Sequence, residues 1–118
     1  MELSIEHLPD GIRLIRLKGR MDIAGSDEVS VRLAAETSTE KAFVVLDLRE
    51  VDFLASVGIG TLVRSAKALR LRGGEAVILS TVPVVTLVLE KTRIHEVMGI
   101  FGDLQSACRA LAPKMQTS

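Results

Sequence analysis

The chain has 118 residues, a length that fits one domain. Lysine plus arginine and aspartate plus glutamate number 15 each, and aromatic residues are only three phenylalanines, so neither a global field nor stacking rings favour a nucleic-acid partner. The single cysteine, Cys108, excludes an internal disulfide framework. Because the sequence lacks the patterns of a signal peptide and of a membrane span, we expect a cytoplasmic protein with no membrane partner.

Two segments near the N-terminus alternate apolar and polar residues. Residues 3–8 and 12–19, joined by the turn sequence "PDG", predict an antiparallel hairpin. The period then changes, because Val29 and Leu33 recur at helical spacing. This pattern predicts a helix of three turns that begins after Ser26.

The middle of the chain alternates apolar runs with one amphipathic segment. Residues 41–48 are a β-branched apolar run without alternation, which suits a central strand covered on both faces. After Ser56 the apolar residues follow helical spacing until "RGG" at 72–74. Residues 75–80 predict a second buried strand.

Residues 81–93 are ambiguous on local grounds. Their valines favour a strand, whereas Thr81 and the early Pro83 are typical of a helix start. A strand here would follow the preceding strand after almost no turn, so we predict a helix, and then a short last strand at 97–101.

The C-terminal segment predicts a closing helix over residues 102–112, capped by Asp103. Residues 113–118 are expected to be a frayed tail. The predicted order is β-β-α-β-α-β-α-β-α, an α/β fold with a mixed, mostly parallel sheet of about five strands and about four helices, within a single domain over residues 1–112. In such sheets the loops at the carboxyl ends of the strands usually carry function, and Ser56 lies on one of them.

The glycines after Ser56 do not complete a phosphate-binding motif. "SVGIGT" lacks the spacing and the lysine of a P-loop, and Val63 stands where a dinucleotide-binding pattern has its third glycine. Close packing of a helix on the sheet explains Gly58 and Gly60 more simply. We therefore expect no nucleotide cofactor.

Catalytic and metal sites also lack their residues. A serine hydrolase has glycine where Leu54 stands, and nothing in the sequence brings His7 or His95 to Ser56. One cysteine and two scattered histidines make no metal-binding spacing. We expect a protein that is not an enzyme, in which Cys108 packs as a small apolar residue.

The carboxylates around the loop have an ordinary interpretation. Asp47 and Asp52 are predicted to be turn and cap residues, although paired carboxylates can also perform acid–base chemistry in a cleft. Ser56 itself has two interpretations. It can cap the following helix, or it can accept a phosphate, because free N–H groups and the helix dipole at that end stabilise negative charge.

The segments "GRMDIAGSDEV", "FVVLDLREVDFLASVGIGTLVRSAKALRLRGGEAVILS" and "VVTLVLEKTRIHEVMGIFGDLQSACRAL" together resemble the STAS domain of bacterial anti-sigma factor antagonists. The resemblance spans about residues 3–112. Its centre is an Asp-Leu strand end, a hydrophobic-aromatic pair and a Ser-containing, Gly-rich loop. These positions are Asp47, Leu48, Val51, Phe53, Ser56, Gly58, Ile59 and Gly60.

The resemblance implies a partner-switching protein. In that family the serine at the position of Ser56 is phosphorylated by an anti-sigma factor that is also a serine kinase, phosphorylation abolishes binding, and a PP2C-type phosphatase resets the protein. Asp22 matches a family acidic residue that helps to position the hydroxyl or the partner. The partner surface implied here comprises Asp22, Leu54, Ala55, Ser56, Val57, Gly58, Arg64 and Lys67.

Two residues depart from the family pattern. Ala55 stands where the family usually has aspartate, and Val57 where it usually has serine or threonine. Loss of the carboxylate removes a like charge that would repel a phosphate, but it also removes a group that a kinase can recognise. These departures favour an alternative, a STAS module that is never phosphorylated and assembles within a larger regulatory or transport complex.

Overall fold

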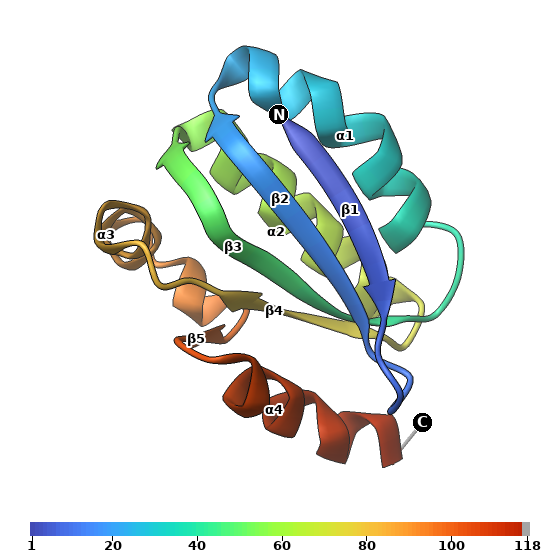
Figure 1. Ribbon diagram of the computed structural model, residues 1–118. Coiled ribbons are helices and arrows are strands. Elements are labelled where there is room, and N and C mark those ends of the chain that lie inside the picture. The colour runs from blue at the N-terminus through green and yellow to red at the C-terminus, as the bar shows by residue number, and fades with distance from the viewer. Residues whose placement is uncertain (117–118) are drawn as a thin grey trace.

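The computed structural model describes residues 1–116, which form five strands, four α-helices and one short 3-10 helix (Figure 1). In chain order these are β1 (Glu2–His7), β2 (Arg13–Met21), α1 (Ile23–Thr37), β3 (Phe43–Leu54), α2 (Ser56–Leu71), β4 (Glu75–Leu79), α3 (Pro83–Lys91), η1 (Ile94–Glu96), β5 (Ile100–Phe101) and α4 (Leu104–Gln116). The predicted order of strands and helices is confirmed, including the helix in the ambiguous segment 81–93.

The strands lie in the order β1-β2-β3-β4-β5 within one sheet. β1 and β2 form the predicted antiparallel hairpin, and each later strand pairs in parallel with the strand before it. Parallel neighbours need a crossover, which the helices provide. The sheet is therefore mixed and mostly parallel, as predicted, and the carboxyl ends of β2, β3 and β4 lie at one edge.

Apolar side chains pack on both faces of the sheet. Along β3, Val44 and Leu46 belong to the cluster that also contains side chains of α1, α2 and α3, whereas Phe43 and Val45 pack with the cluster that contains α4. Figure 1 shows α4 alone across the second face. This arrangement explains why β3 is apolar without alternation, because side chains on both of its faces are buried.

Helix α1 begins earlier than predicted. Its N-cap is Asp22, whose carboxylate accepts a hydrogen bond from the Gly25 N–H at 2.8 Å, and Ser26 is buried within the helix. The prediction of a start after Ser26 was wrong because Asp22, Ser26 and Asp27 all have side chains that can cap a helix. Which of these residues becomes the N-cap depends on where β2 ends.

The chain end also differs from the expected tail. Asp103 accepts hydrogen bonds from the backbone N–H and the hydroxyl of Ser106, as expected of a cap, but α4 continues through Pro113 to Gln116. Lys114 pairs with Glu75 at the start of β4, and Met115 packs against the α4 cluster. Residues 113–116 thus extend the helix, while residues 117–118, also expected to fray, lie outside the described residues.

Asp47 is not a turn residue, as had been predicted, but a buried carboxylate inside β3. Its side chain is 1% exposed and accepts hydrogen bonds from the Arg49 N–H at 3.0 Å, from the Arg49 guanidinium at 3.0 and 2.8 Å, and from Arg16 Nε at 3.4 Å. Asp52 likewise lies within β3, where it is exposed. β3 extends to Leu54 because its last residues pair with β2, a long-range contact that local patterns do not report.

Irregular pairing accompanies the buried carboxylate. Arg16 lies opposite Asp47 and Lys18 opposite Glu50, and a second shift follows between Gly19 and Arg20. Such bulges bend a strand and redirect its side chains. The bulges that begin at Asp47 therefore set the direction of the end of β3. This end leads directly into the loop at Ser56.

Candidate functional site

The loops that follow β2 and β3 meet at the carboxyl edge of the sheet. The Ala55 N–H donates to the Met21 carbonyl at 3.1 Å, so the residue before Ser56 is tied to the residue before Asp22. Two segments that are more than thirty residues apart in the chain are thereby brought side by side. The structure places the predicted loop and its predicted acidic neighbour at one location.

Ser56 is the first residue of α2 rather than its cap. Ala55 is the N-cap, with φ −94° and ψ 167°, and its carbonyl accepts from the Gly58 and Ile59 N–H groups at 2.9 and 3.1 Å. Of the two interpretations of Ser56, the one that makes it the helix cap is therefore wrong. A capping residue must be extended, and the bond between Ala55 and β2 holds Ala55 in that conformation.

The start of α2 consequently has unused donors. Within residues 1–116, neither the Ser56 nor the Val57 backbone N–H donates a hydrogen bond, and α2 has no side-chain cap. The Ser56 side chain is exposed and has no partner in the same range. An exposed hydroxyl thus lies at the positive end of a helix dipole, where a negative group is stabilised.

Asp22 has a structural role at this edge. Its carboxylate caps α1 and pairs with Arg20 Nε at 3.5 Å. The hydrogen bond from Gly25, followed by the contact with Arg20, holds the pKa of Asp22 below its ordinary value. Within the described residues Asp22 makes no hydrogen bond to Ser56, so its carboxylate orders the adjacent helix start instead.

The other predicted partner residues divide by exposure. Leu54 and Gly58 are buried, so they support the loop from beneath. Val57, Arg64 and Lys67 are exposed, and Ala55 is half-buried. The surface around Ser56 is therefore made by the outward residues of the loop and of α2.

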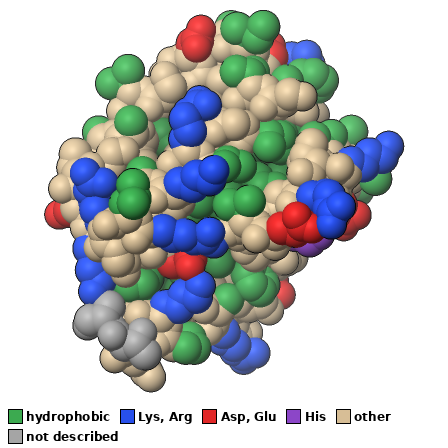
Figure 2. Space-filling model, turned by 180° about the vertical axis from the view of Figure 1, so that it is seen from behind, with side chains coloured by type: hydrophobic (Ala, Val, Ile, Leu, Met, Phe, Trp, Pro, Cys, Tyr) green, Lys and Arg blue, Asp and Glu red, His purple; other side chains and the backbone are tan. Residues whose placement is uncertain are grey.

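The outward face of α2 is basic. Ser56, Gly60, Val63 and Lys67 follow one another at helical spacing on this face. Arg64 and Arg70 are also exposed on α2, which contains no acidic residue. On the side of the molecule that carries α2, Lys and Arg side chains lie beside an apolar area (Figure 2). This face suits a partner with acidic and apolar groups.

The sequence did not predict Arg20 or Phe53 as part of the surface beside Ser56. The Arg20 guanidinium lies over the Phe53 ring, 4.2 Å from its centre, and Phe53 is an exposed residue opposite Arg20 in the sheet. Each residue is visible in the sequence, but their contact depends on the bulged register of β2 and β3. Together they extend the exposed surface beside the loop.

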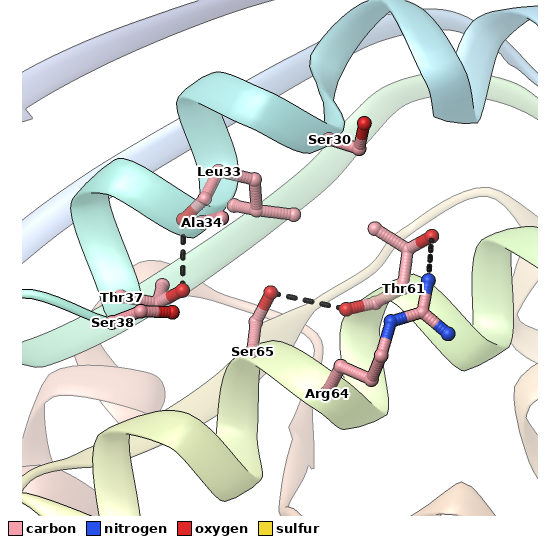
Figure 3. A pocket seen from close by; sticks show the side chains of 8 residues that line it. All are labelled: Ser30, Leu33, Ala34, Thr37, Ser38, Thr61, Arg64 and Ser65. Atoms are coloured by element: carbon pink, nitrogen blue, oxygen red, sulfur yellow. Dashed lines mark hydrogen bonds between the residues drawn. The ribbon is translucent and has the colours of Figure 1, made fainter.

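A hollow of about 180 Å³ between α1 and α2 has hydroxyl groups on its walls (Figure 3). Thr37 donates to the Leu33 carbonyl at 2.8 Å, and Ser65 donates to the Thr61 carbonyl at 3.0 Å. Each of these hydroxyls therefore serves its own helix. The hollow is the seam between two packed helices and not a second site.

The residues excluded as catalytic groups lie elsewhere. His7 pairs with Arg13 at the start of β2, at the opposite end of the sheet from Ser56, and His95 is exposed in η1. Cys108 packs against the α4 cluster, as predicted, and burial raises the pKa of its thiol. Within residues 1–116, no three His, Cys, Asp or Glu side chains are grouped to hold a metal ion, and no helix has the length and apolarity to span a bilayer.

The two glycines near Ser56 differ in their packing. A Cβ on Gly58 would lie 2.8 Å from Leu54 Cδ1 and from Met21 Cγ, which confirms close packing on the sheet, whereas a Cβ on Gly60 would meet only Arg64 Nη1, at 3.3 Å. The common explanation predicted for both glycines is thus wrong for Gly60.

We expect Gly58→Ala to lower the free energy of unfolding by about 1–2 kcal/mol through overpacking. Gly60→Ala is expected to raise it by about 0.5–1 kcal/mol, because alanine is the better helix former and the neighbour is flexible. Urea unfolding monitored by circular dichroism measures both. Equal changes in the two variants would contradict this assignment.

Comparisons with known proteins agree with this fold. The chain is 28% identical over 110 residues to BtrV of Bordetella bronchiseptica, which is named provisionally as an anti-sigma factor antagonist, and the match covers 93% of this chain and 94% of that one. The crystal structure of an anti-sigma factor antagonist from Mycobacterium paratuberculosis superimposes with a TM-score of 0.84 at 21% identity, covering 94% and 93% of the two chains.

The phosphorylated form of the Bacillus cell fate determinant SpoIIAA has the same fold, with a TM-score of 0.68 at 15% identity, covering 92% of this chain and 99% of that one. The family model described as "STAS domain" matches residues 6–107. This match covers most of the chain and includes the loop at Ser56. The chain belongs to the STAS domain family.

Proposed function

We propose that this protein is a non-enzymatic anti-sigma factor antagonist of a partner-switching pathway. The unmodified protein binds an anti-sigma factor that is also a serine kinase, which releases the sigma factor or an equivalent target. Phosphorylation of Ser56 abolishes this binding, and a PP2C-type phosphatase restores it. The observation that supports the proposal is the exposed Ser56 hydroxyl beside free backbone N–H groups at the start of α2.

The names of related proteins point in the same direction. BtrV and the Mycobacterium paratuberculosis protein are named as anti-sigma factor antagonists, and SpoIIAA is known in a phosphorylated form. These properties belong to those proteins. Their transfer to this chain depends on whether Ser56 is a kinase substrate.

Ser56 can accept a phosphate without a change of fold. Its side chain is exposed, so the γ-phosphorus of ATP can bond to Oγ as ADP leaves and the hydroxyl proton is removed by the kinase. The phosphate adds about −1.5 to −2 charges. The helix dipole favours such a charge, and neither Ala55 nor α2 supplies a carboxylate that would oppose it.

The proposed partner surface comprises the exposed part of the predicted set. Val57 supplies apolar area beside Ser56, and Arg64 and Lys67 supply positive charge along α2. Ala55 lies at the rim of this surface. Asp22 lies beside it and caps the start of α1. A phosphate at the centre of such an interface would face the acidic groups of the partner, and like charges brought together at an interface cost several kcal/mol, which is sufficient to release the partner.

Incubation with the cognate anti-sigma factor kinase and Mg-ATP tests the proposal. Intact-mass and peptide spectrometry are expected to show one added phosphate, on Ser56, and none on the Ser56→Ala variant. A phosphate on another residue, or none, would contradict phosphorylation at this site. A stable assembly that forms with other proteins and ignores ATP would support the alternative of a structural STAS module.

A further inference from the structure

The side chain of Arg64 points back along α2 toward Ser56. Its Nη2 donates to Thr61 Oγ1 at 3.1 Å, one turn closer to the start of the helix (Figure 3). Its Nη1 lies 3.3 Å from the position that a Cβ of Gly60 would occupy. The guanidinium therefore covers the place of the missing Gly60 side chain.

Gly60 is the residue next to Ser56 on the outward face of the helix. Positions i and i+4 of an α-helix have Cβ atoms about 5–6 Å apart. The Ser56 side chain, once lengthened by the Oγ–P and P–O bonds of a phosphate, spans much of this distance. A side chain at position 60 would stand in this path, and glycine leaves it open.

Arg64 is also free to take an anionic partner. Among residues 1–116 it forms no ion pair, and its hydrogen bond to Thr61 goes to a neutral hydroxyl. α2 contains no Asp or Glu that would compete for it. Guanidinium groups bind phosphate through two parallel hydrogen bonds, which are stronger than bonds between neutral groups.

We propose that Arg64 is the counter-ion of phosphorylated Ser56, with its guanidinium donating to the phosphate oxygens across Gly60. This inference rests on the proposed function, since it assigns a partner to the phosphate of that same site. Phosphorylation of Ser56 then has two effects on the surface of α2. It adds an anion beside Val57, and it withdraws Arg64 from the surface that faces the anti-sigma factor.

The experiment uses protein in which phosphoserine is encoded at position 56 during translation, so that no kinase is needed. Phosphorus NMR follows the loss of the second phosphate proton as pH is raised, in the otherwise unchanged protein and in Arg64→Gln. We expect the unchanged protein to lose this proton at lower pH, with a proton-binding constant about two- to fivefold weaker than in Arg64→Gln. Salt at 0.5 M should reduce this difference in proton binding between the two proteins, because it screens the charge of Arg64.

Lys67→Gln is the matched control. It removes a cation from the same face of α2, one turn farther from Ser56, and is expected to titrate like the unchanged protein. The charged residues at the adjoining strand ends, Arg20, Asp22 and Asp52, are identical in every variant, so the comparison isolates Arg64.

An equal titration of Arg64→Gln and the unchanged protein would overturn the assignment, as would an equal effect of Lys67→Gln. Gly60→Leu is a second test, because its side chain fills the path while leaving Arg64 in the chain. It should move the titration toward that of Arg64→Gln, and no movement would overturn pairing across Gly60. A kinase that fails to modify Ser56 would count against the proposed function alone, because the encoded phosphoserine is independent of it.

Discussion

Ser56→Asp is expected to weaken binding to the anti-sigma factor by about a hundredfold or more, while Ser56→Ala binds at least as tightly as the unmodified protein. The carboxylate would be buried against the partner without a matching cation, at a cost of several kcal/mol, and each 1.4 kcal/mol is tenfold in affinity. Calorimetric titration of the two variants with the anti-sigma factor measures the difference.

Loss of stability should not be the cause of the weaker binding of Ser56→Asp. Aspartate in the first turn of α2 interacts favourably with the helix dipole, so the melting temperature of Ser56→Asp should be unchanged or higher. Gln105→Asp is the matched control, since Gln105 is exposed in the first turn of α4 on the other face of the sheet. Equal affinities of Ser56→Asp and Ser56→Ala would show that charge at this position is not the switch.

The phosphate should act more strongly than its carboxylate substitute. Aspartate carries one charge on a short side chain and does not reach as far toward Gly60 as a phosphate on the serine oxygen. If Arg64 pairs with the phosphate, the aspartate variant leaves Arg64 available to the anti-sigma factor. Phosphorylated protein is therefore expected to bind more weakly than Ser56→Asp in the same titration.

Asp47→Ala is expected to lower the free energy of unfolding by about 3 kcal/mol. The carboxylate is 1% exposed and accepts four hydrogen bonds from Arg49 and Arg16, and removal of one member of a buried ion pair typically costs 3–5 kcal/mol. We expect the lower end of this range because the Arg16 and Arg49 side chains are more than a third exposed. Water can therefore solvate them when the carboxylate is removed. Urea unfolding at neutral pH measures the change.

Acid should weaken the same cluster. Burial alone would raise the pKa of Asp47, but the Arg49 side chain and backbone N–H, together with Arg16, hold it below its ordinary value of 3.8. A lowered folded-state pKa means that the stabilisation is complete above pH about 4 and is lost as pH falls toward the folded-state value. The stability of Asp47→Asn should consequently fall less steeply between pH 5 and 3.

Asp52→Ala is the control for both measurements. Asp52 lies in the same strand but is exposed, so its replacement should change stability by no more than about 0.5 kcal/mol. An effect of Asp47→Ala as small as that of Asp52→Ala would show that the arginine cluster does not stabilise the bulge. The direction in which the end of β3 leads to Ser56 would then need another explanation.

The positions of the helices and strands followed from local patterns because hydrophobic periodicity reports which side chains are buried. The alternation in residues 3–8 and 12–19 and the apolar run in residues 41–48 correspond to β1, β2 and the start of β3. The helix within 81–93 followed from Pro83 and from the shortness of any turn before it. Each of these inferences depends only on neighbours in the chain.

The ends of elements did not follow from local patterns. Ser26 and Ser56 were both considered as N-caps, yet the caps are Asp22 and Ala55. A cap is selected by where the preceding strand ends, and strand ends are decided by pairing. Ala55 is held extended by its bond to the Met21 carbonyl, a contact between distant segments that no local pattern encodes.

The sequence by itself determined the α/β order, the buried strands and a serine at a strand-to-helix junction, because short-range periodicity and composition specify them. The tertiary structure alone decided that Asp47 is buried in a bulge, that Asp22 caps α1, and that Arg64 reaches back over Gly60. These features depend on sheet register and on side-chain direction. Pairing between β2 and β3 holds Ala55 as the N-cap and leaves Ser56 exposed at the first position of α2.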